Sequence, residues 1–337
     1  MKAWLERQWY RNGLWAHLML PLAWLMCALV WLRRMAYRTG LFTAWRAPVP
    51  VLIVGNITVG GTGKTPLVLW LVDYLKTQGW HPGIISRGYG GQSRNAAPVI
   101  PMSRAGEVGD EPLLMARRAD CPVWIGRDRP AAARGLLAAH PECDVLVSDD
   151  GLQHYALARD VEIVVVDGRR LYGNGRMLPA GPLREPLSRL AQVDAVVLNG
   201  AEPDPWASEY GVDEYGMVLH GDVFQPVAAP LAGVLPVDFS GKRLHAIAGI
   251  GNPARFFDHL RSLGLTIVEH PFPDHHPFEP ADLQIAHADA ILMTEKDAVK
   301  CVAFAPENAW YLPVRAEVDG EFGVKVLEEI AKVKDGR

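Results

Sequence analysis

The chain has 337 residues, of which 49% are hydrophobic and 21% are charged; this excludes a disordered or fibrous protein and suits a globular one of about two domains. The net charge of −4 is uneven, because positions 1–46 hold seven Lys or Arg and one acidic residue, which leaves 27 basic and 37 acidic residues after them. Such an acidic body is a poor general binder of phosphate backbones, so we expect no nucleic-acid partner.

The first element in chain order is an uncharged run at positions 14–32, flanked by arginines on both sides. At about 1.5 Å per residue, a helix of this length nearly covers a hydrocarbon core of about 30 Å. Trp and Tyr near both ends suit membrane interfaces, whereas His17 and Pro21 weaken a spanning helix. No small-residue cleavage pattern supports a signal peptide. We expect 1–46 to be a membrane-anchoring helical segment; a buried core helix is the alternative.

The arginines that follow this run indicate on which side of a membrane the rest of the chain lies. Arg33, Arg34, Arg38 and Arg46 favour a cytoplasmic body. The four cysteines are far apart and include no CxxC pair, as expected for thiols in a reducing compartment.

A glycine-rich segment at 58–65 follows an apolar run at 49–54 and precedes an amphipathic stretch. Strand, glycine loop and helix in this order predict a phosphate-binding loop, in which backbone N–H groups surround phosphates, a Lys binds the β- and γ-phosphates and a hydroxyl binds Mg²⁺. The usual motif has Gly where this chain has Thr58. A glycine turn with a solvated Lys is the alternative, but it does not explain why Lys-Thr directly follows the last glycine. The predicted nucleotide-binding residues are Thr58, Val59, Gly60, Gly61, Thr62, Gly63, Lys64 and Thr65.

Short β-branched runs alternate with helical stretches after Pro48, and this rhythm predicts an α/β fold with a P-loop NTPase-like parallel sheet flanked by helices. Positions 168–188, rich in Gly, Pro and Arg, predict a functional loop. A second αβ rhythm from 244 onward predicts a smaller C-terminal α/β lobe. The expected domains are a kinase core at 47–215, a two-stranded linker at 216–240 and the smaller lobe at 241–337, whose start pairs with the core across the cleft.

Two carboxylates, Asp149 and Asp150, end the apolar run at 145–148. P-loop enzymes hold Mg²⁺ with the loop hydroxyl and an Asp at such a position, so Thr65 and one of the two Asp are candidate metal ligands. Two solvated carboxylates in an Asp-Asp-Gly turn are the alternative.

Asp110 begins a predicted helix, where it would be either an N-terminal cap or a base that accepts the proton of an attacking hydroxyl. His275 lies between Asp274 and His276 in a turn rich in Pro and Phe, and its imidazole suits proton relay or the orientation of a carboxylate. A zinc site is the rival for this turn, although no Cys and no spaced third ligand lies near it.

Several further polar residues are candidates for binding an anionic substrate. Gln153 and His154 follow the Asp pair, Arg129 follows an apolar run together with Arg127, and Arg184 lies in the long loop. An arginine at such a site binds phosphate or carboxylate through its paired N–H groups, but each of these arginines alone is more often a surface charge.

Seven segments of the chain together resemble the tetraacyldisaccharide 4′-kinase family, which phosphorylates the lipid A precursor in Gram-negative bacteria. They are GNITVGGTGKTP at 55–66, SRGYG at 86–90, GDEP at 109–112, DDGLQH at 149–154, GPLREP at 181–186, FPDH at 272–275 and TEKD at 294–297. The resemblance covers nearly the whole chain, and in it Thr58 is the family's own form of the loop. It implies an N-terminal membrane-embedded helix, ATP and Mg²⁺ as cofactors and an acylated disaccharide 1-phosphate as substrate.

The resemblance also implies roles for individual residues. The catalytic group is Asp110, His275, Lys64 and Asp150, in which Asp110 works with His275 on the 4′-hydroxyl. The metal ligands are Thr65, Asp149, Asp150 and Glu111. The substrate residues are Ser86, Arg87, Gly88, Tyr89, Gln153, His154, Arg129 and Arg184. The product would be lipid IVA, made at the bacterial inner membrane with the catalytic body on the cytoplasmic side of the inner leaflet, and no oligomer is required.

A membrane-associated P-loop NTPase switch is the alternative function. Its D-x-x-G element would need Asp at the position of Ser148, and its base-reading motif would need Lys at the position of Glu295. A dehydrogenase would need a complete G-x-G-x-x-G, which the chain lacks.

Overall fold

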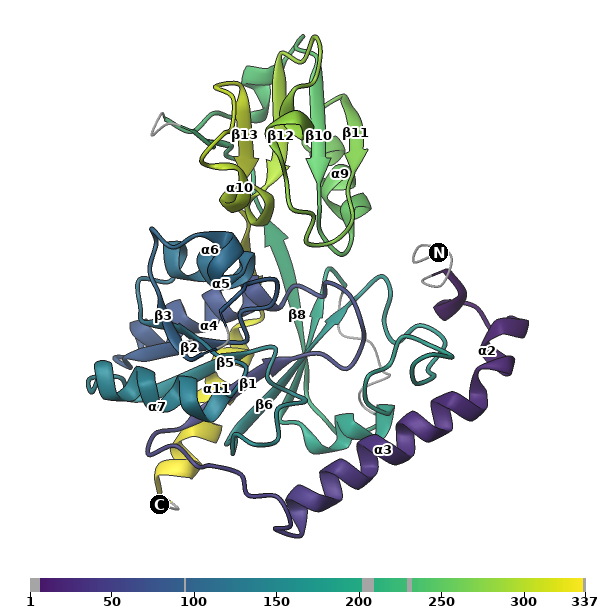
Figure 1. Cartoon of the computed structure of the whole chain (residues 1–337), viewed down its shortest axis with the longest axis vertical. Coiled ribbons are helices and arrows are strands. Elements are labelled where there is room, and N and C mark those ends of the chain that lie inside the picture. The colour runs from purple at the N-terminus through teal and green to yellow at the C-terminus, as the bar shows by residue number, and fades with distance from the viewer. Residues whose placement is uncertain (1–6, 94, 202–208, 229–231, 336–337) are drawn as a thin grey trace.

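The computed structural model describes residues 7–93, 95–201, 209–228 and 232–335. A larger part built on a nine-stranded sheet lies below a smaller lobe built on a five-stranded sheet (Figure 1). The larger sheet contains β1 (Val51–Gly55), β2 (Pro82–Ser86), β3 (Ala97–Val99), β4 (Val123–Ile125), β5 (Val145–Asp149), β6 (Val161–Asp167), β7 (Ala195–Asn199), β8 (Glu214–His220) and β14 (Arg315–Val318). The α/β class predicted from the sequence is thereby confirmed.

Strand β1 lies at the centre of the large sheet, parallel to β5 on one side and to β6 on the other. The strand order β14-β8-β7-β6-β1-β5-β2-β4-β3 is parallel except at its two edges, where β3 and β14 run antiparallel to their neighbours. After β1 the chain forms β2, β3, β4 and β5, all on one side of β1, and then crosses to the other side to form β6, so the end of β1 is a topological switch point. Ligands of open α/β sheets bind in the crevice outside such a point.

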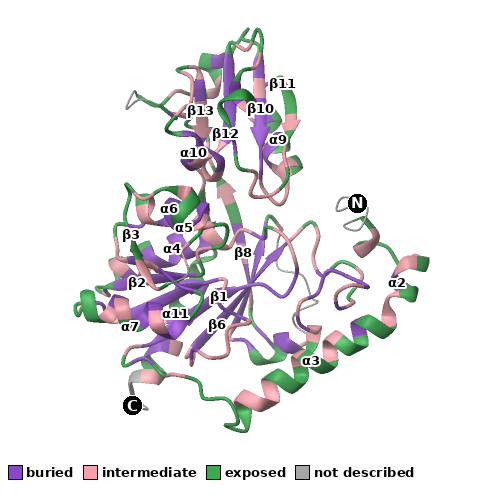
Figure 2. Cartoon of the chain, in the orientation of Figure 1, coloured by how far each residue is buried: buried purple, intermediate pink, exposed green. Residues whose placement is uncertain are grey.

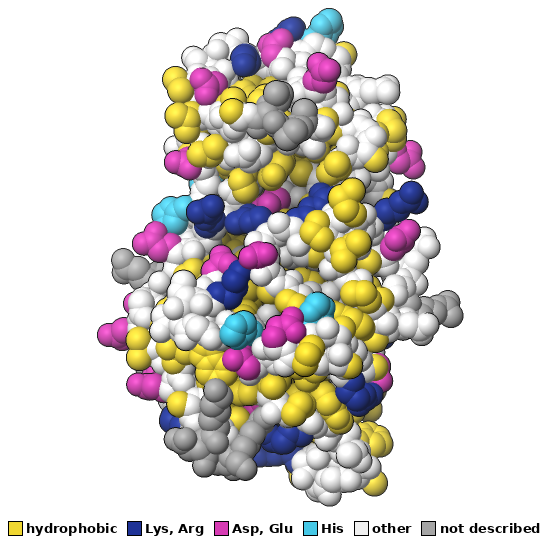
Figure 3. Space-filling view, turned by 90° about the vertical axis from the view of Figure 1, so that its left-hand side faces the viewer, with side chains coloured by type: hydrophobic (Ala, Val, Ile, Leu, Met, Phe, Trp, Pro, Cys, Tyr) yellow, Lys and Arg dark blue, Asp and Glu magenta, His cyan; other side chains and the backbone are white. Residues whose placement is uncertain are grey.

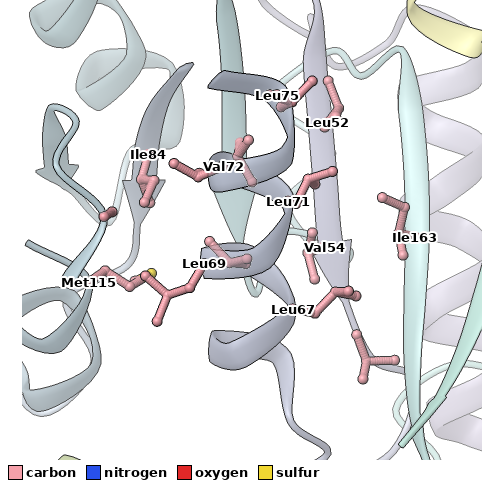
Figure 4. Packing of buried hydrophobic residues seen from close by; sticks show 14 of the residues in the cluster. Leu52, Val54, Leu67, Leu69, Leu71, Val72, Leu75, Ile84, Met115 and Ile163 are labelled. Atoms are coloured by element: carbon pink, nitrogen blue, oxygen red, sulfur yellow. The ribbon is translucent and has the colours of Figure 1, made fainter. Parts of the chain in front are cut away.

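Alternate residues of β1 point to opposite faces of the sheet and contribute to two separate cores. Leu52 and Val54 pack with Leu67 and Leu71 of α4 (Lys64–Thr77), as Figure 4 shows. The same face is covered by α6 (Asp110–Arg118) and α11 (Gly320–Asp335), and the other by α7 (Arg129–Ala139) and α3 (Leu20–Arg38). Each fully buried Leu contributes about 1.5–3 kcal/mol, so this packing holds the loop between β1 and α4 on a rigid support. Figure 2 shows the buried strands between these layers.

The smaller lobe has the strand order β11-β10-β12-β13-β9. Its strands are β9 (Gln225–Pro226), β10 (Leu244–Ala248), β11 (Ile267–Pro271), β12 (Ala290–Thr294) and β13 (Ala309–Leu312). Helix α9 (Pro253–Ser262) packs on one face with Phe257, and α10 (Glu295–Cys301) packs on the other with Cys301. The second αβ rhythm of the sequence therefore forms a lobe with its own core.

Two antiparallel strands connect the lobes. β8 leaves the large sheet toward the smaller lobe, and β14 returns beside it, so that Arg315 pairs with His220. Within the two-stranded linker expected at 216–240, β8 supplies one strand of this connection, but β9 pairs with β13 in the smaller lobe, and the second strand of the connection is β14. After β14 the chain re-enters the large core, where Phe322 of α11 packs against Tyr215.

The N-terminal segment forms two helices, α2 (Leu14–Leu18) and α3, with Pro21 in the first turn of α3. Among the described residues, no helix combines the length and the apolar character needed to cross a membrane, so the spanning form of the expected anchor is not supported. A buried core helix is also not what forms, because Ala23 is the only buried residue of α3. Leu25, Trp24 and Trp31 are 56%, 66% and 60% exposed. Helix α3 runs along the outer edge of the larger part (Figure 2).

Candidate functional site

The loop between β1 and α4 has the backbone conformation of a phosphate-binding loop. Gly60 and Gly63 have positive φ values of 107° and 97°, which glycine tolerates. Gly63 is also the N-cap residue of α4 and supplies no capping side chain, so the N–H groups of the first turn remain available for an anion. The carbonyl of Thr62 accepts a hydrogen bond from Asn199 Nδ2 at 2.8 Å, which fixes the loop against the end of β7.

The two carboxylates after β5 lie beside this loop, because Val54 of β1 is in register with Asp149. Asp150, in the left-handed region with φ 48°, forms ion pairs from Oδ1 to Lys64 Nζ at 3.4 Å and to Arg184 Nη1 at 3.6 Å. Burial alone would raise the pKa of Asp150, but the charges of Lys64 and Arg184 outweigh it and hold this pKa below its usual value. The ionised carboxylate of Asp150 therefore holds two cationic side chains at the loop.

Asp149 is buried in a different environment. Its Oδ2 accepts a hydrogen bond from Ser86 Oγ at 3.2 Å, whereas its Oδ1 is buried and has no hydrogen-bond partner. Burial, followed by the charges of Glu111 and Asp150, raises the pKa of Asp149 to about 7. Three carboxylates thus lie close enough to oppose ionisation of one of them, and a bound cation would relieve this.

Arg129 is fully buried at the start of α7. Its guanidinium donates to the carbonyls of Asp149 at 2.8 Å and Gly126 at 3.1 Å, and burial lowers its pKa to about 10. We expected this residue to bind an anionic substrate, but the structure instead places it under the Asp pair, where it fixes the backbone of that turn. Arg127, by contrast, is exposed.

A second polar cluster joins the two lobes. His275 Nδ1 lies 3.0 Å from Asp110 Oδ2, Lys296 Nζ donates to Glu111 Oε1 at 2.8 Å, and Lys300 Nζ lies 4.0 Å from Asp110 Oδ2. Burial alone would raise the pKa of Asp110, but the hydrogen bond with His275 and the charges of Lys296 and Lys300 hold it below its usual value. Asp110 is therefore an ionised carboxylate that is only 2% exposed.

Aromatic and glycine residues of the segment after β2 lie against this cluster. The ring centroid of Tyr89 is 4.9 Å from that of His275, and Tyr89 is 59% exposed. A Cβ on Gly109 would lie 2.5 Å from the carbonyl oxygen of Tyr89, so this approach requires glycine. Arg87 and Gly88 lie between Tyr89 and the buried Ser86, which donates to Asp149 and is not open to a ligand.

The smaller lobe also approaches the phosphate-binding loop directly. The turn at 249–251, which links β10 to α9, lies so close that a Cβ on Gly251 would be 2.7 Å from the backbone nitrogen of Gly61. Asp297 Oδ2 accepts the N–H of Gly249 at 2.9 Å, and the carbonyl of Gly249 accepts the N–H of His275 at 3.1 Å. Asp297 therefore holds the turn that carries His275. Figure 3 shows Lys and Arg side chains gathered at the narrowing between the lobes.

The remaining predicted residues form a network around Glu185, which is fully buried. Gln153 Nε2 donates to Glu185 Oε1 at 2.7 Å and to the carbonyl of Asn56 at 3.1 Å, so it links the long loop to the phosphate-binding loop. Backbone hydrogen bonds from Val59 N to Pro182 O and from Arg184 N to Ile57 O add to this link. Burial, reinforced by neighbouring arginines, lowers the pKa of His154 to about 4, so its imidazole is neutral.

No group of three or more His, Cys, Asp or Glu placed to hold a metal by itself occurs in the described part of the chain, so the zinc hypothesis gains no support there. His276, next to His275, is paired with Asp282 at 2.9 Å.

Two residues at the site were missed from the sequence. Asn199 ends the apolar run of β7, and a polar residue at that point was the available signal. Arg255 of α9 donates to Asn199 Oδ1 and lies 3.9 Å from Asp167 Oδ2, a contact between lobes that no local pattern indicates.

Comparisons with known proteins show the family of this chain. A family model described as tetraacyldisaccharide-1-P 4′-kinase matches residues 15–331. The tetraacyldisaccharide 4′-kinase of Methylobacillus flagellatus is 52% identical over 98% of this chain and 97% of its own, and that of Azoarcus sp. is 53% identical over 96% and 94%. A crystal structure of LpxK from Aquifex aeolicus in complex with ATP is similar with a TM-score of 0.78 and 30% identity, covering 94% of this chain and 99% of that one.

Proposed function

The chain belongs to the tetraacyldisaccharide-1-P 4′-kinase family, and from this membership we infer that it transfers the γ-phosphate of ATP to the 4′-hydroxyl of a tetraacyldisaccharide 1-phosphate. The product is lipid IVA, and the reaction is a step of lipid A and lipopolysaccharide synthesis. The observation that carries the proposal at the site is that the smaller lobe contacts both the phosphate-binding loop, where Gly251 approaches Gly61, and Asp110, through His275.

The ATP end of the site is the loop from Thr58 to Thr65. Its N–H groups would surround the phosphates. Lys64 would exchange its ion pair with Asp150 for contacts with the phosphate oxygens. Arg184 is paired with the same carboxylate of Asp150 and could also turn from it to bind a phosphate oxygen. The similar structure in complex with ATP supports nucleotide binding here.

We propose that Mg²⁺ is held by Thr65 together with Asp149, Asp150 and Glu111. The fit rests on the unpartnered Oδ1 of Asp149 and on the burial and the neighbouring charges of Glu111 and Asp150, which together raise its pKa to about 7. Mg²⁺ in phosphoryl-transfer sites takes one or two carboxylates and completes its shell with phosphate oxygens and water, so a full protein cage is not required. When bound, the ion neutralises charge on the transferring phosphate.

Asp110 is proposed to accept the proton of the 4′-hydroxyl as that hydroxyl attacks the γ-phosphate. Its carboxylate is ionised, and His275 holds it in one orientation from across the lobe boundary. Tyr89, Gly88 and Arg87 form the adjoining edge where the sugar would enter. Closure of the lobes around the substrate would keep water away from the γ-phosphate.

We further propose that α3 lies on the inner leaflet of the bacterial inner membrane, with the catalytic body on the cytoplasmic side. Leu22, Leu25, Leu29 and Leu32 recur at helical spacing and are 50–56% exposed, which is typical of a helix that rests in an interface. This position would place the site beside its acylated substrate.

The test is a transfer assay with detergent-solubilised protein, γ-labelled ATP, Mg²⁺ and the tetraacyldisaccharide 1-phosphate. Label in the lipid supports the kinase. Release of labelled inorganic phosphate with no labelled lipid would instead support the NTPase switch, an alternative that family membership does not favour. Glu295, which stands where such a switch would have its base-reading Lys, forms an ion pair with Arg118 at 2.6 Å.

A further inference from the structure

A cavity of about 350 Å³ lies between the C-terminal end of α3 and the body of the protein. It is separate from the cluster of Asp110 and from the phosphate-binding loop, and none of the roles described above uses it. Its lining residues come from α3, from the segment after β5, and from β6 and η1 (Leu187–Gln192). They are Arg34, Tyr37, Arg38, Tyr155, Arg159, Glu162, Arg189 and Gln192.

The cavity has more positive charge than its own acids can balance. Arg159 and Arg189 share one carboxylate, Glu162, at 2.9 Å and 2.5 Å, and Arg189 lies 3.3 Å from a second, Glu185. Within the part of the chain that the structure describes, Arg34 donates only to the neutral amide oxygen of Gln192. Four arginines therefore face two glutamates. The side chain of Arg38 has no hydrogen-bond or ion-pair partner among the described residues.

The buried part of this cavity is rigid. Arg189 is 2% exposed and held by two carboxylates, and the guanidinium of Arg159 lies over the ring of Tyr155 at 5.2 Å. Tyr37 packs against the same ring, with centroids 5.9 Å apart. Tyr155 in turn donates its hydroxyl to Glu185 Oε2 at 2.8 Å. A ligand here would meet groups already in place, which lowers the entropy lost on binding.

The position of the cavity on α3 relates it to a membrane. The body-facing stripe of the helix is apolar at Ala23, Cys27 and Val30, and it becomes polar at Arg34 and Tyr37, where the cavity opens. The outward stripe remains apolar and exposed up to Leu32. A helix resting in the interface on that stripe would hold the cavity at the level of the lipid headgroups.

We propose that this cavity binds the phosphate of an anionic membrane-lipid headgroup while the apolar stripe of α3 lies in the same leaflet. Arginine guanidinium groups match phosphate oxygens through paired N–H donors, and the unbalanced charge of the cavity selects an anion. One apolar element alone gives weak, reversible membrane binding, and a second, charge-based contact makes it stable. The inference rests on the proposed position of α3 and not on the transfer reaction. The 1-phosphate of the substrate offers the same chemistry, so the test must separate the two sources.

The experiment measures binding of the full chain to vesicles of phosphatidylcholine alone and of an equimolar mixture of phosphatidylcholine and phosphatidylglycerol. Arg38→Gln is the test variant, and Arg33→Gln is its matched control. Arg33 is on the same helix with the same charge and does not line the cavity, although its guanidinium lies 5.5 Å from the ring centroid of Tyr155. Loss of a charged hydrogen bond should weaken binding to the mixed vesicles more than tenfold in Arg38→Gln. Loss of diffuse attraction should weaken it no more than about fivefold in Arg33→Gln. Both variants should bind phosphatidylcholine vesicles as the unmodified protein does.

Equal losses in the two variants would overturn the proposal, because surface charge alone would then explain the attraction. A rise in KM for the disaccharide 1-phosphate in Arg38→Gln, with vesicle binding unchanged, would also overturn it and would assign the cavity to the substrate phosphate. Inorganic phosphate added with saturating ATP should displace the protein from mixed vesicles more than sodium chloride of equal ionic strength does. Vesicle binding requires no turnover, so an inactive preparation that still shows this pattern would count against the proposed reaction and not against the cavity.

Discussion

His275 Nδ1 lies 3.0 Å from Asp110 Oδ2, although the two residues are separated by 165 positions and belong to different lobes. His275 has a positive φ of 61° and is held by the carbonyl of Gly249, which in turn is fixed by Asp297. The pair therefore exists only when the smaller lobe sits against α6. Any movement of one lobe relative to the other would make or break it, so lobe closure and the state of Asp110 are coupled.

Substitution of Asp110 tests its role as the base. We expect Asp110→Ala to lower kcat by about 10²–10⁴-fold, the usual contribution of a positioned acid or base, with little change in ATP affinity. The physical reason is that Asp110 contacts His275 and Lys296 and not the phosphate-binding loop. Turnover and nucleotide binding are measured separately, by label transfer and by titration calorimetry. Equal losses in both would refute the role.

The pH dependence of activity should change when His275 is removed. The hydrogen bond from His275 stabilises ionised Asp110 and lowers its pKa, whereas burial raises this pKa. Loss of the hydrogen bond should therefore raise the pKa of Asp110. If Asp110 is the base, as we propose, activity requires its ionised carboxylate, and the acid limb of the kcat/KM profile should therefore move to higher pH in His275→Ala. His276→Ala is the control, because His276 is paired with Asp282 and should leave the limb in place. An unmoved limb in His275→Ala would show that the hydrogen bond does not tune Asp110.

Arg129 should behave as a structural residue in spite of its charge. Arg129→Met leaves the carbonyls of Asp149 and Gly126 without a donor and should cost about 3 kcal/mol of unfolding free energy. Thermal denaturation measures this, with exposed Arg127→Met as the control, for which we expect no change in Tm. A normal Tm in Arg129→Met, combined with a higher KM for the lipid, would restore Arg129 to the substrate site.

How much the sequence predicts depends on whether the signal is local. The loop at 58–65 and the carboxylates at 149–150 were predictable because each is a short motif next to an apolar run, and the parallel order of β1 and β5 brings them together. Strands β3 and β14 were missed, since segments of three and four residues at the sheet edges carry no periodicity. The burial of Arg129 and the hydrogen bond from Lys296 to Glu111 depend on packing between distant segments. The spacing of residues along the sequence does not indicate such packing.

Gly63 tests how closely the phosphate-binding loop packs. A Cβ at this position would lie 2.2 Å from Asn199 Nδ2, and φ is 97°. Gly63→Ala should therefore displace Asn199 or the loop and weaken ATP binding by at least about tenfold. The left-handed backbone should in addition lower the free energy of unfolding by about 1 kcal/mol. Gly79→Ala is the matched control, because Gly79 has a φ of 82° but no atom within 4 Å of its added Cβ. It should lose stability by a similar backbone term and keep its ATP affinity; equal ATP affinities in the two variants would show that the contact with Asn199 is not needed.

Asp149 should make the nucleotide-free protein less stable as the pH rises. Its pKa is about 7 in the folded protein and about 3.9 in an unfolded chain, so between these values the unfolded chain releases a proton that the folded protein keeps. Asp149 therefore does not lower the free energy of unfolding below about pH 4. Its destabilising effect grows as the pH rises toward 7, and above pH 7 it reaches up to about 4 kcal/mol. Asp149→Asn removes the titration, so in metal-free buffer it should raise Tm by several degrees at pH 8 and have little effect at pH 4. Mg²⁺ with a non-hydrolysable ATP analogue should raise the Tm of the unmodified protein at pH 8 and do so much less in the variant, because the ion compensates the same buried charge. If Asp149→Asn and the unmodified protein show the same dependence of Tm on pH, the carboxylate is not held at a raised pKa, and the argument for a cation beside it is lost.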